Sequence, residues 1–163
     1  MATANQNLSD HDPNKVPNAK GMKISIVVAE WNSEITENLK SGAVATLIKF
    51  GAIPEDIQVE YVPGSYELPM GAQYFLESTE CDAVICLGCV IQGETKHFDF
   101  VCEAVSQGIK DVSLKYNTPV IFGVLTDNTI EQSRARSGGK LGNKGDEAAV
   151  TAIKMVALKQ RLA

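Results

Sequence analysis

The chain has 163 residues, of which 44% are hydrophobic and 21% charged, a composition that is ordinary for a single soluble globular domain. Its formal net charge is -5 and it contains no long basic run, so nucleic acid is not an expected partner. No apolar stretch approaches the ~20 residues that cross a bilayer, and the N-terminus lacks the apolar core of a signal peptide. We therefore expect a cytoplasmic protein with no membrane partner.

The N-terminal segment 1–21 is polar and contains Pro13 and Pro17. Such a segment is typical of a mobile tail, or of an arm that docks on another surface. We expect a flexible N-terminal arm over residues 1–21, followed by a single domain over residues 22–163. The rest of the sequence contains neither an internal repeat nor a second domain boundary.

Four apolar, β-branched runs alternate with helical patterns along the domain. Such runs predict buried strands, and apolar residues that recur every three or four positions predict amphipathic helices. The predicted strands are 22–29, 56–62, 82–90 and 119–126. The predicted helices are 33–51, which starts with Ser33 as its N-cap, then 70–78, 97–116, 129–136 and 143–161. This alternation predicts an α/β fold with a parallel sheet and helices on both faces.

The four cysteines are Cys81, Cys86, Cys89 and Cys102, and the middle two form a C-x-x-C motif. That spacing occurs in redox pairs and in zinc sites. A redox pair normally opens a helix, and a structural zinc site needs a second pair. Here the motif lies in an apolar strand, where residues three apart face opposite sides. Reduced, mostly buried thiols are therefore favoured over a metal site or a disulfide.

Polar and aromatic residues directly follow the first three predicted strands. In parallel sheets, ligands bind outside the carboxyl ends of the strands, so we expect these residues to meet at one rim. They are Glu30–Asn32, Gly64–Glu67 and Val90–His97. The stretch "AEWNSE" is not a flavodoxin-type phosphate loop, and the paired acids of a phospho-accepting receiver domain are missing from these strand ends.

Each group at this rim has a structural explanation beside a functional one. Trp31, the only tryptophan, is either a partly buried lid on the first helix or a stacking platform for a flat heterocycle. The stretch "QGETKH" either caps a helix or binds an anion with backbone N–H groups. His97 either packs with one hydrogen bond or transfers protons near neutral pH. The stretch "RARSGGKLGNKG" is either a solvated linker or holds a phosphate.

Six segments taken together resemble the lumazine synthase family, in its order and with its spacing, from about Ile24 to Ala157. They are "AEWN", "VPGSYELP", "GCVIQGETKHFDFV", "PVIFGVLT", "EQSRARSG" and "GNKG". The resemblance implies a flavodoxin-like three-layer sandwich with a four-stranded parallel sheet. It implies the penultimate enzyme of riboflavin biosynthesis, which joins 5-amino-6-(D-ribitylamino)uracil to 3,4-dihydroxy-2-butanone 4-phosphate. The product is 6,7-dimethyl-8-ribityllumazine, phosphate and water are released, and neither a metal nor an organic cofactor is needed.

The resemblance also implies roles for individual residues. The implied pyrimidine-binding residues are Trp31, Ser65, Tyr66, Glu67, Cys89, Val90, Ile91 and Phe122. The implied phosphate-binding residues are Glu94, Thr95 and Arg136, and the implied catalytic residues are His97, for proton transfer, and Arg136. The resemblance also implies that Phe122 and Arg136 come from the neighbouring subunit.

Members of the family assemble as pentamers with active sites between adjacent subunits, and many close into a 60-subunit icosahedral shell. The "SGGKLGNKG" connection has no insertion, which favours the shell. Two other classes of function stay open. One is a non-catalytic scaffold, which the loss of His97 or Arg136 would have indicated. The other is an α/β module that binds a flavin-like ligand without turnover.

Overall fold

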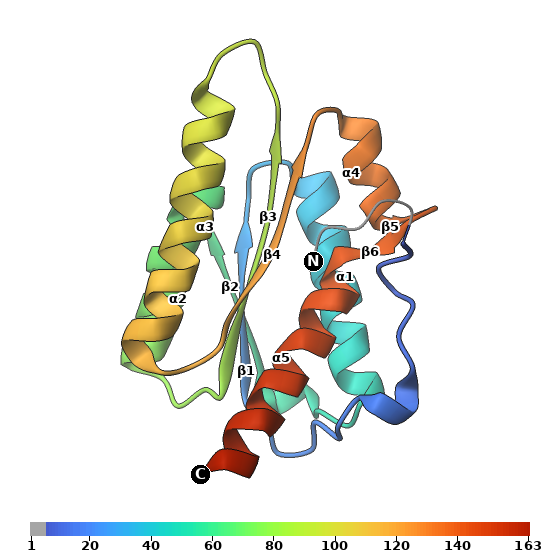
Figure 1. Ribbon diagram of the computed structural model, residues 1–163, viewed down its shortest axis with the longest axis vertical. Coiled ribbons are helices and arrows are strands. Elements are labelled where there is room, and N and C mark those ends of the chain that lie inside the picture. The colour runs from blue at the N-terminus through green and yellow to red at the C-terminus, as the bar shows by residue number, and fades with distance from the viewer. Residues whose placement is uncertain (1–5) are drawn as a thin grey trace.

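The computed structural model describes residues 6–163. Its strands β1 (Ile24–Ala29), β2 (Ile57–Val62), β3 (Ala83–Ile91) and β4 (Val120–Asp127) form one parallel sheet in the order β2-β1-β3-β4 (Figure 1). This is the start of the flavodoxin-like strand order. β1 is buried along its whole length because the sheet is covered on both faces. The predicted α/β fold with a four-stranded parallel sheet is confirmed.

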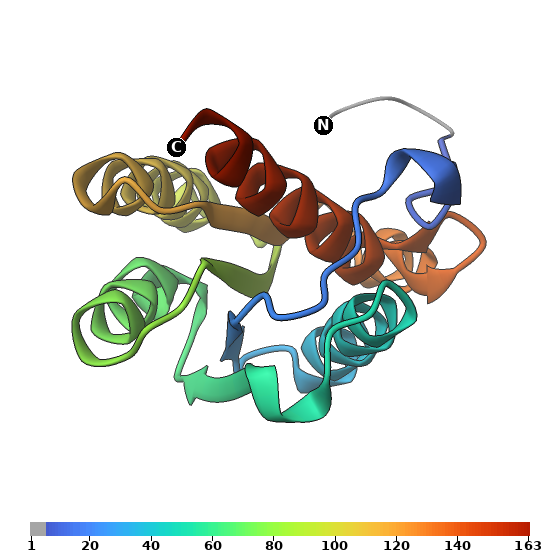
Figure 2. The same ribbon diagram turned by 90° about the horizontal axis from the view of Figure 1, so that it is seen from below.

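Helices form a layer on each face of the sheet, as Figure 2 shows from below. One layer contains α1 (Ser33–Lys49), α4 (Ile130–Arg136) and α5 (Lys144–Leu162), and the other contains α2 (Leu68–Ser78) and α3 (His97–Tyr116). Each layer encloses its own apolar core against the sheet. The expected three-layer sandwich is therefore confirmed.

Cys86 and Cys89 both lie on β3, where successive side chains point to opposite faces of the sheet. Cys89 faces the core under α1 and α5, whereas Cys86 faces the core under α2 and α3, so the C-x-x-C thiols point to opposite sides of the sheet. All four cysteines are free thiols, and Cys86 and Cys89 are buried, whereas Cys81 and Cys102 are half-buried. Among residues 6–163, no group of His, Cys, Asp and Glu side chains is placed to hold a metal ion.

The "GNKG" motif serves the contact between α1 and α5. The Asn143 side chain caps α5 by accepting from the Gly145 N–H (2.8 Å), and its amide donates to the carbonyl of Asn38 in α1 (2.9 Å). A Cβ at Gly145 would lie 1.9 Å from the Leu39 carbonyl oxygen. The two helices therefore approach each other so closely that only glycine fits at this position.

The predicted elements differ from the observed ones by at most two residues at either end, and α3 has the predicted bounds. The predicted N-cap of α1 was wrong. Ser33 is the first helical residue, and Asn32 takes the N-cap position with left-handed backbone angles (φ 61°, ψ 46°). The connection between α4 and α5 is not a plain linker either, because β5 (Ser137–Gly139) and β6 (Gly142–Asn143) pair antiparallel within it. The described chain also contains the short 3-10 turns η1 (Pro13–Lys15) and η2 (Pro54–Asp56), and a third such turn lies at the site described below.

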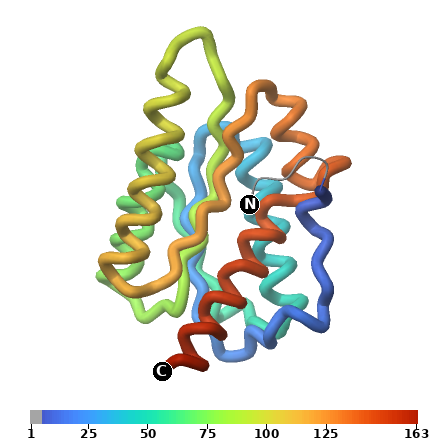
Figure 3. The backbone as a smooth tube through the Cα atoms, viewed as in Figure 1, coloured from blue at the N-terminus to red at the C-terminus, as the bar shows by residue number. Residues whose placement is uncertain are grey.

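Residues 6–21 of the expected arm lie against the domain. Ala19 is fully buried and its N–H donates to the Phe50 carbonyl at the end of α1 (2.7 Å), while the Leu8 N–H donates to the Leu141 carbonyl between β5 and β6 (2.8 Å). Figure 3 shows this segment as the blue tube that rises along the α1 side. Residues 1–5 lie outside the described residues, so the flexibility of the whole arm, and the division at residue 21, stay predictions. Within residues 6–163, no helix has the length and apolar character needed to cross a membrane.

Candidate active site

A cavity of about 660 Å³ opens at the edge where the strands end, which we call the carboxyl edge. Its walls come from the β1–α1 turn, from the 3-10 turn η3 (Ser65–Glu67) after β2, from the end of β3 and from the start of α3. This is the edge at which open α/β sheets bind their ligands. The structure brings most of the predicted site residues together in this cavity: Trp31, Ser65, Tyr66, Glu67, Cys89, Val90, Ile91, Thr95 and His97.

Three predicted residues lie outside the cavity of their own chain. Glu94 is exposed in the loop before α3. Phe122 lies on the edge strand β4 and packs, half-buried, against the core under α2 and α3. Arg136 is the last residue of α4, on the other face of the sheet. One chain therefore does not bring the predicted phosphate arginine to the predicted pyrimidine pocket.

The cavity also contains residues to which the sequence gave no role. Phe98 and Val101 lie three apart in the first turns of α3, so they share one side of the helix. Apolar residues at this spacing normally indicate a core-facing stripe, and only the position of α3 turns them toward the cavity. Asn32 and Gly64 were expected at the rim, although without a function.

Trp31 is presented to the solvent side of the cavity. The residue is 72% exposed, whereas its backbone N–H donates to the Pro63 carbonyl (3.2 Å). The preceding Glu30 N–H donates to Val62 (2.8 Å), so the β1–β2 ladder continues up to the tryptophan. A ring this exposed does not fit the alternative of a partly buried lid on α1. It fits a flat platform whose backbone is fixed and whose face is accessible.

Ser65 presents a polar atom in the buried wall of the cavity. Its side chain is almost fully buried, and within residues 6–163 no group forms a hydrogen bond with its Oγ. An unpaired buried hydroxyl costs about 1–3 kcal/mol. Gly88 makes this arrangement possible, because a Cβ there would lie 2.5 Å from Ser65 Oγ. Ser65 therefore lines the cavity with a hydroxyl that no group of the described chain satisfies.

The start of α3 combines a cap with an exposed imidazole. Thr95 Oγ1 accepts from the backbone N–H of His97 (3.4 Å), so Thr95 acts in part as a cap. The His97 side chain is exposed and lines the cavity. The positive end of the macrodipole of a 20-residue helix lies here, and it favours a bound anion.

Two of the cations in the basic stretch are already paired. Arg134 donates from Nε and Nη2 to the two carboxylate oxygens of Glu34 (2.7 and 3.0 Å). This hydrogen-bonded pair holds the pKa of Glu34 below its ordinary value and raises the pKa of Arg134. Lys144 forms an ion pair with Glu147 (2.9 Å). Neither cation is well placed to bind a phosphate.

Arg136 is held at one end only. Its Nη1 donates to the Gln132 carbonyl (3.0 Å) and lies 3.8 Å from Asp127 Oδ1. Within the described part of the chain, Nε and Nη2 of Arg136 have no hydrogen-bond partner. Of the two arginines in "RAR", Arg136 is therefore the one whose Nε and Nη2 groups remain available to bind an anion in a bidentate way.

Cys89 connects the wall of the cavity to a buried polar chain. Its Sγ lies 3.3 Å from Ser133 Oγ, and Ser133 Oγ donates to Asp127 Oδ2 (2.8 Å). Burial raises the pKa of the Cys89 thiol, the Ser133 hydrogen bond lowers it and the negative charge of Asp127 raises it. The thiol is therefore protonated at neutral pH and donates to Ser133.

Comparison with known proteins identifies the family. The family model for 6,7-dimethyl-8-ribityllumazine synthase matches residues 21–160, a range that contains the whole sheet and the cavity. The chain belongs to this family. A lumazine synthase of Parabacteroides distasonis is 60% identical over 156 residues, covering 96% of this chain and 98% of the relative.

Two further relatives carry the same name. The 6,7-dimethyl-8-ribityllumazine synthase of Phocaeicola vulgatus is 52% identical over 162 residues, which cover 99% of this chain and 96% of the relative. That of Flavobacterium johnsoniae is 56% identical over 161 residues, with coverage of 99% and 85%. The resemblance to the lumazine synthase family is thereby confirmed along nearly the whole chain.

Proposed function

We propose that this member of the family is an active 6,7-dimethyl-8-ribityllumazine synthase of riboflavin biosynthesis. It condenses 5-amino-6-(D-ribitylamino)uracil with 3,4-dihydroxy-2-butanone 4-phosphate and releases phosphate and water. The observation that carries the proposal is the cavity at the carboxyl edge, where an exposed indole, an unpaired hydroxyl and an imidazole meet. A catalyst that joins two substrates gains much of its rate by holding them in reacting geometry.

The pyrimidine substrate binds between Trp31 and the end of β3. Its flat ring stacks on the indole, an interaction worth about 1–3 kcal/mol for a base on an aromatic side chain. The ribityl hydroxyls exchange hydrogen bonds with Ser65 and with the neighbouring η3 residues Tyr66 and Glu67. The segment Cys89–Ile91 supplies the wall along the ring.

His97 transfers protons in the condensation. An amine that attacks a ketone and a phosphate that leaves both require proton movement, which an imidazole carries out near neutral pH. His97 is accessible from the cavity and lies in the first turn of α3. Glu94 and Thr95 form the turn that receives the phosphate beside the helix N-terminus.

Arg136 and Phe122 complete the site of a neighbouring subunit. Support for this comes from their position near the edge strand β4 and the end of α4, outside the cavity of their own chain. The protein therefore works as a homo-oligomer with sites between adjacent subunits. We propose a pentamer that closes into a 60-subunit icosahedral shell.

The reaction is tested with purified protein and both substrates, by following lumazine absorbance and phosphate release. The informative pair is Arg136→Ala and Arg134→Ala, because both remove one guanidinium from the same helix but only Arg136 has an unpaired edge. We expect Arg136→Ala to lose about 10²-fold or more of the rate, as when an enzyme loses one charge-stabilising donor. Arg134→Ala keeps most of the rate. His97→Ala loses less than Arg136→Ala, because the condensation also proceeds without an enzyme.

Two outcomes would favour the alternatives. An assembled parent protein that is no faster than the uncatalysed reaction would indicate a scaffold. Affinity for riboflavin or the lumazine product without turnover would indicate a ligand-binding module.

The shared site is tested by complementation. Chains with Trp31→Ala and His97→Ala are dissociated, mixed with Arg136→Ala chains and reassembled. A site between subunits predicts that the mixture regains activity above either parent preparation, because some interfaces then combine intact halves. No recovery in correctly reassembled mixtures would contradict a shared site, and sedimentation that shows only isolated pentamers across pH and phosphate concentration would refute the shell.

A further inference from the structure

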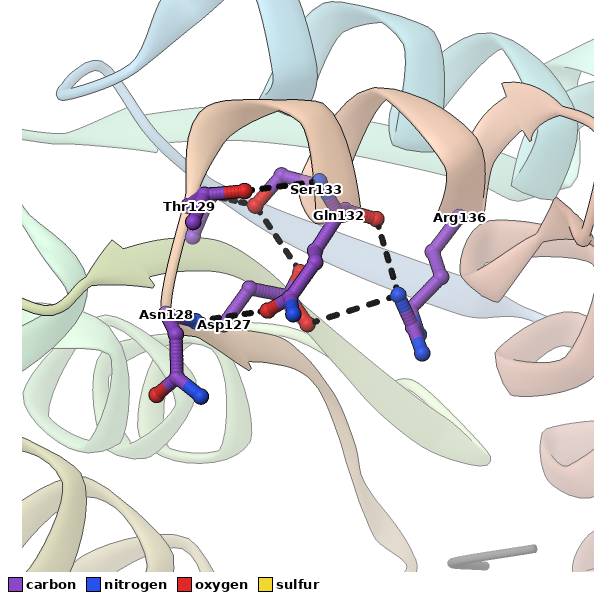
Figure 4. A network of polar contacts seen from close by, with 7 residues as sticks. Asp127, Asn128, Thr129, Gln132, Ser133 and Arg136 are labelled. Carbon is purple, nitrogen blue, oxygen red and sulfur yellow. Dashed lines mark hydrogen bonds and ion pairs between the residues drawn. The ribbon is translucent and has the colours of Figure 1, made fainter. Parts of the chain in front are cut away.

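The carboxylate of Asp127 lies between two groups of helix α4. Its side chain is only 10% exposed, its Oδ2 accepts from Ser133 Oγ (2.8 Å) and its Oδ1 lies 3.8 Å from Arg136 Nη1 (Figure 4). A carboxylate is rarely buried to this extent unless it is paired. Asp127 does not line the cavity of its own chain, and its side-chain contacts are with Ser133 and Arg136.

The chain segment around Asp127 fixes this arrangement locally. Asp127 is the last residue of β4, in register with Ile91 at the end of β3. The turn into α4 is closed by the Thr129 side chain, which accepts from the Gln132 N–H (3.4 Å), and by Gln132 Oε1, which accepts from the Asn128 N–H (2.8 Å). Ser133 and Arg136 are three residues apart, so both project from one side of α4 toward the end of β4.

The two carboxylate oxygens of Asp127 have different partners. Ser133 orients one oxygen, and the Ser133 hydroxyl is itself oriented because it accepts a hydrogen bond from the Cys89 thiol (3.3 Å). The other oxygen faces Nη1 of Arg136, the same nitrogen that donates to the Gln132 carbonyl. The guanidinium is thus anchored through Nη1, which leaves Nε and Nη2 directed away from the anchor.

We propose that Asp127 is a positioning residue for Arg136. It holds the guanidinium so that the Nε–Nη2 edge is presented to the phosphate of 3,4-dihydroxy-2-butanone 4-phosphate. The inference rests on the proposed function, in which Arg136 binds that phosphate. An unanchored arginine loses rotamer freedom when it binds an anion, and this cost weakens binding. A prepositioned guanidinium has lost part of that freedom beforehand. Asp127 acts only through Arg136 and touches neither substrate.

The test uses Asp127→Asn in the full, assembled protein. Asparagine keeps the shape and an acceptor for Ser133 but removes the charge that faces Arg136. We expect KM for the phosphorylated substrate to rise about twofold to fivefold, in line with the worth of a partly exposed ion pair, while KM for the pyrimidine stays unchanged. Glu131→Gln is the matched control, because it removes one negative charge from α4, the helix that carries Arg136, without a contact to Arg136.

A double-mutant cycle separates positioning from general damage. In an Arg136→Ala background, Asp127→Asn has no further effect on KM if it acts through the guanidinium. A full additive effect in that background, or an unchanged or lowered KM in the single variant, would overturn the proposal. Ser133→Ala removes the hydrogen bond that orients Asp127, together with the one that Ser133 accepts from Cys89, and it should raise the same KM to a smaller extent. This variant keeps the test informative if Asp127→Asn does not assemble.

Binding of inorganic phosphate provides a readout that does not depend on turnover. Phosphate should raise the unfolding temperature of the parent, and Asp127→Asn should need a higher phosphate concentration for the same rise. If the parent shows no synthase activity but this difference is present, the proposed function fails and the positioning role stands. If turnover is normal and neither KM nor phosphate binding responds to Asp127→Asn, the positioning role fails alone.

Discussion

The side-chain amide of Asn32 donates a hydrogen bond to the backbone carbonyl of Cys89 (2.9 Å) and so joins the start of α1 to the end of β3. Asn32 adopts left-handed backbone angles, which asparagine tolerates better than most residues. The bond fixes Trp31, the preceding residue, at the mouth of the cavity.

Replacing Asn32 separates the contribution of its side-chain hydrogen bond from the cost of its left-handed backbone angles. Asn32→Ala loses the hydrogen bond and strains the backbone, so we expect the free energy of unfolding to fall by about 2–3 kcal/mol. Asn32→Gly loses the bond but tolerates φ of 61°, and should be about 1 kcal/mol more stable than the alanine variant. Urea denaturation of both proteins measures the difference. Equal stability of the two variants would show that the left-handed angles carry no cost.

Removal of the Trp31 indole should affect binding and leave folding intact. Because the residue is 72% exposed, Trp31→Ala should change the free energy of unfolding by less than about 0.5 kcal/mol. Loss of stacking should raise KM for the pyrimidine by about fivefold to a hundredfold. Steady-state kinetics and thermal unfolding test the two parts. A large fall in stability would mean that the ring packs in the assembled protein.

Gly88→Ala should disturb the cavity wall from behind. The new methyl would lie 2.5 Å from Ser65 Oγ and 2.9 Å from Leu68 Cδ1, so η3 must move. Overpacking of this kind costs about 1–3 kcal/mol. We expect KM for the pyrimidine to rise, because Ser65 is displaced. A normal KM in the Gly88→Ala variant would exclude Ser65 from the binding surface.

Gly145→Ala should be the most destabilising glycine substitution in the α1–α5 contact. Its Cβ would lie 1.9 Å from the Leu39 carbonyl oxygen, a backbone atom that cannot rotate away. We expect a loss of about 3 kcal/mol or failure to fold. Gly93→Ala is the control, since no atom lies within 4 Å of its added Cβ, and its stability should stay within about 0.5 kcal/mol of the parent. Tolerance of alanine at 145 would contradict the close helix contact.

Cys86 should make stability decrease in alkaline solution. Complete burial raises the pKa of its thiol well above the ordinary value, so the folded state keeps a proton that the unfolded chain releases above pH ~8.5. The contribution of the protonated Cys86 thiol to the free energy of unfolding is fully present below that pH. It is lost as pH rises further, at up to about 1.4 kcal/mol per pH unit. Urea denaturation of parent and Cys86→Ala between pH 8 and 10, under reducing conditions, measures the two slopes. Parallel slopes would mean that Cys86 ionises as readily in the folded state.

The local sequence was sufficient to predict the sheet and its helices. Short apolar, β-branched runs such as 82–90 predict buried strands, and the apolar spacing over 97–116 continues along the whole of α3. The rim residues could also be predicted, because they directly follow strands whose carboxyl ends must meet.

Features that depend on distant partners could not be predicted. Asn32 replaces Ser33 as N-cap because its amide reaches Cys89, which is 57 positions away. Asp127 looks like a turn residue in the stretch "TDNT", and only the position of Ser133 and Arg136 explains why it is buried. The Gly145–Leu39 approach also requires knowledge of which helices pack together. Phe122 received its role from family resemblance alone, and only the resemblance selected Arg136 among the cations of the basic stretch, since their own chain does not bring either residue to the cavity.

The contact of α5 with α1 has a consequence for synthesis on the ribosome. α1 buries Leu39 and Ala43 against a helix that begins only at Lys144, and Gly145 meets Leu39 directly. A nascent chain that has emerged as far as β4 therefore has its sheet strands but still exposes the part of α1 that α5 covers. This surface is covered only when α5 has left the tunnel. Nascent chains that stop before α5 thus leave part of the apolar surface of α1 exposed, which favours aggregation with other incomplete chains.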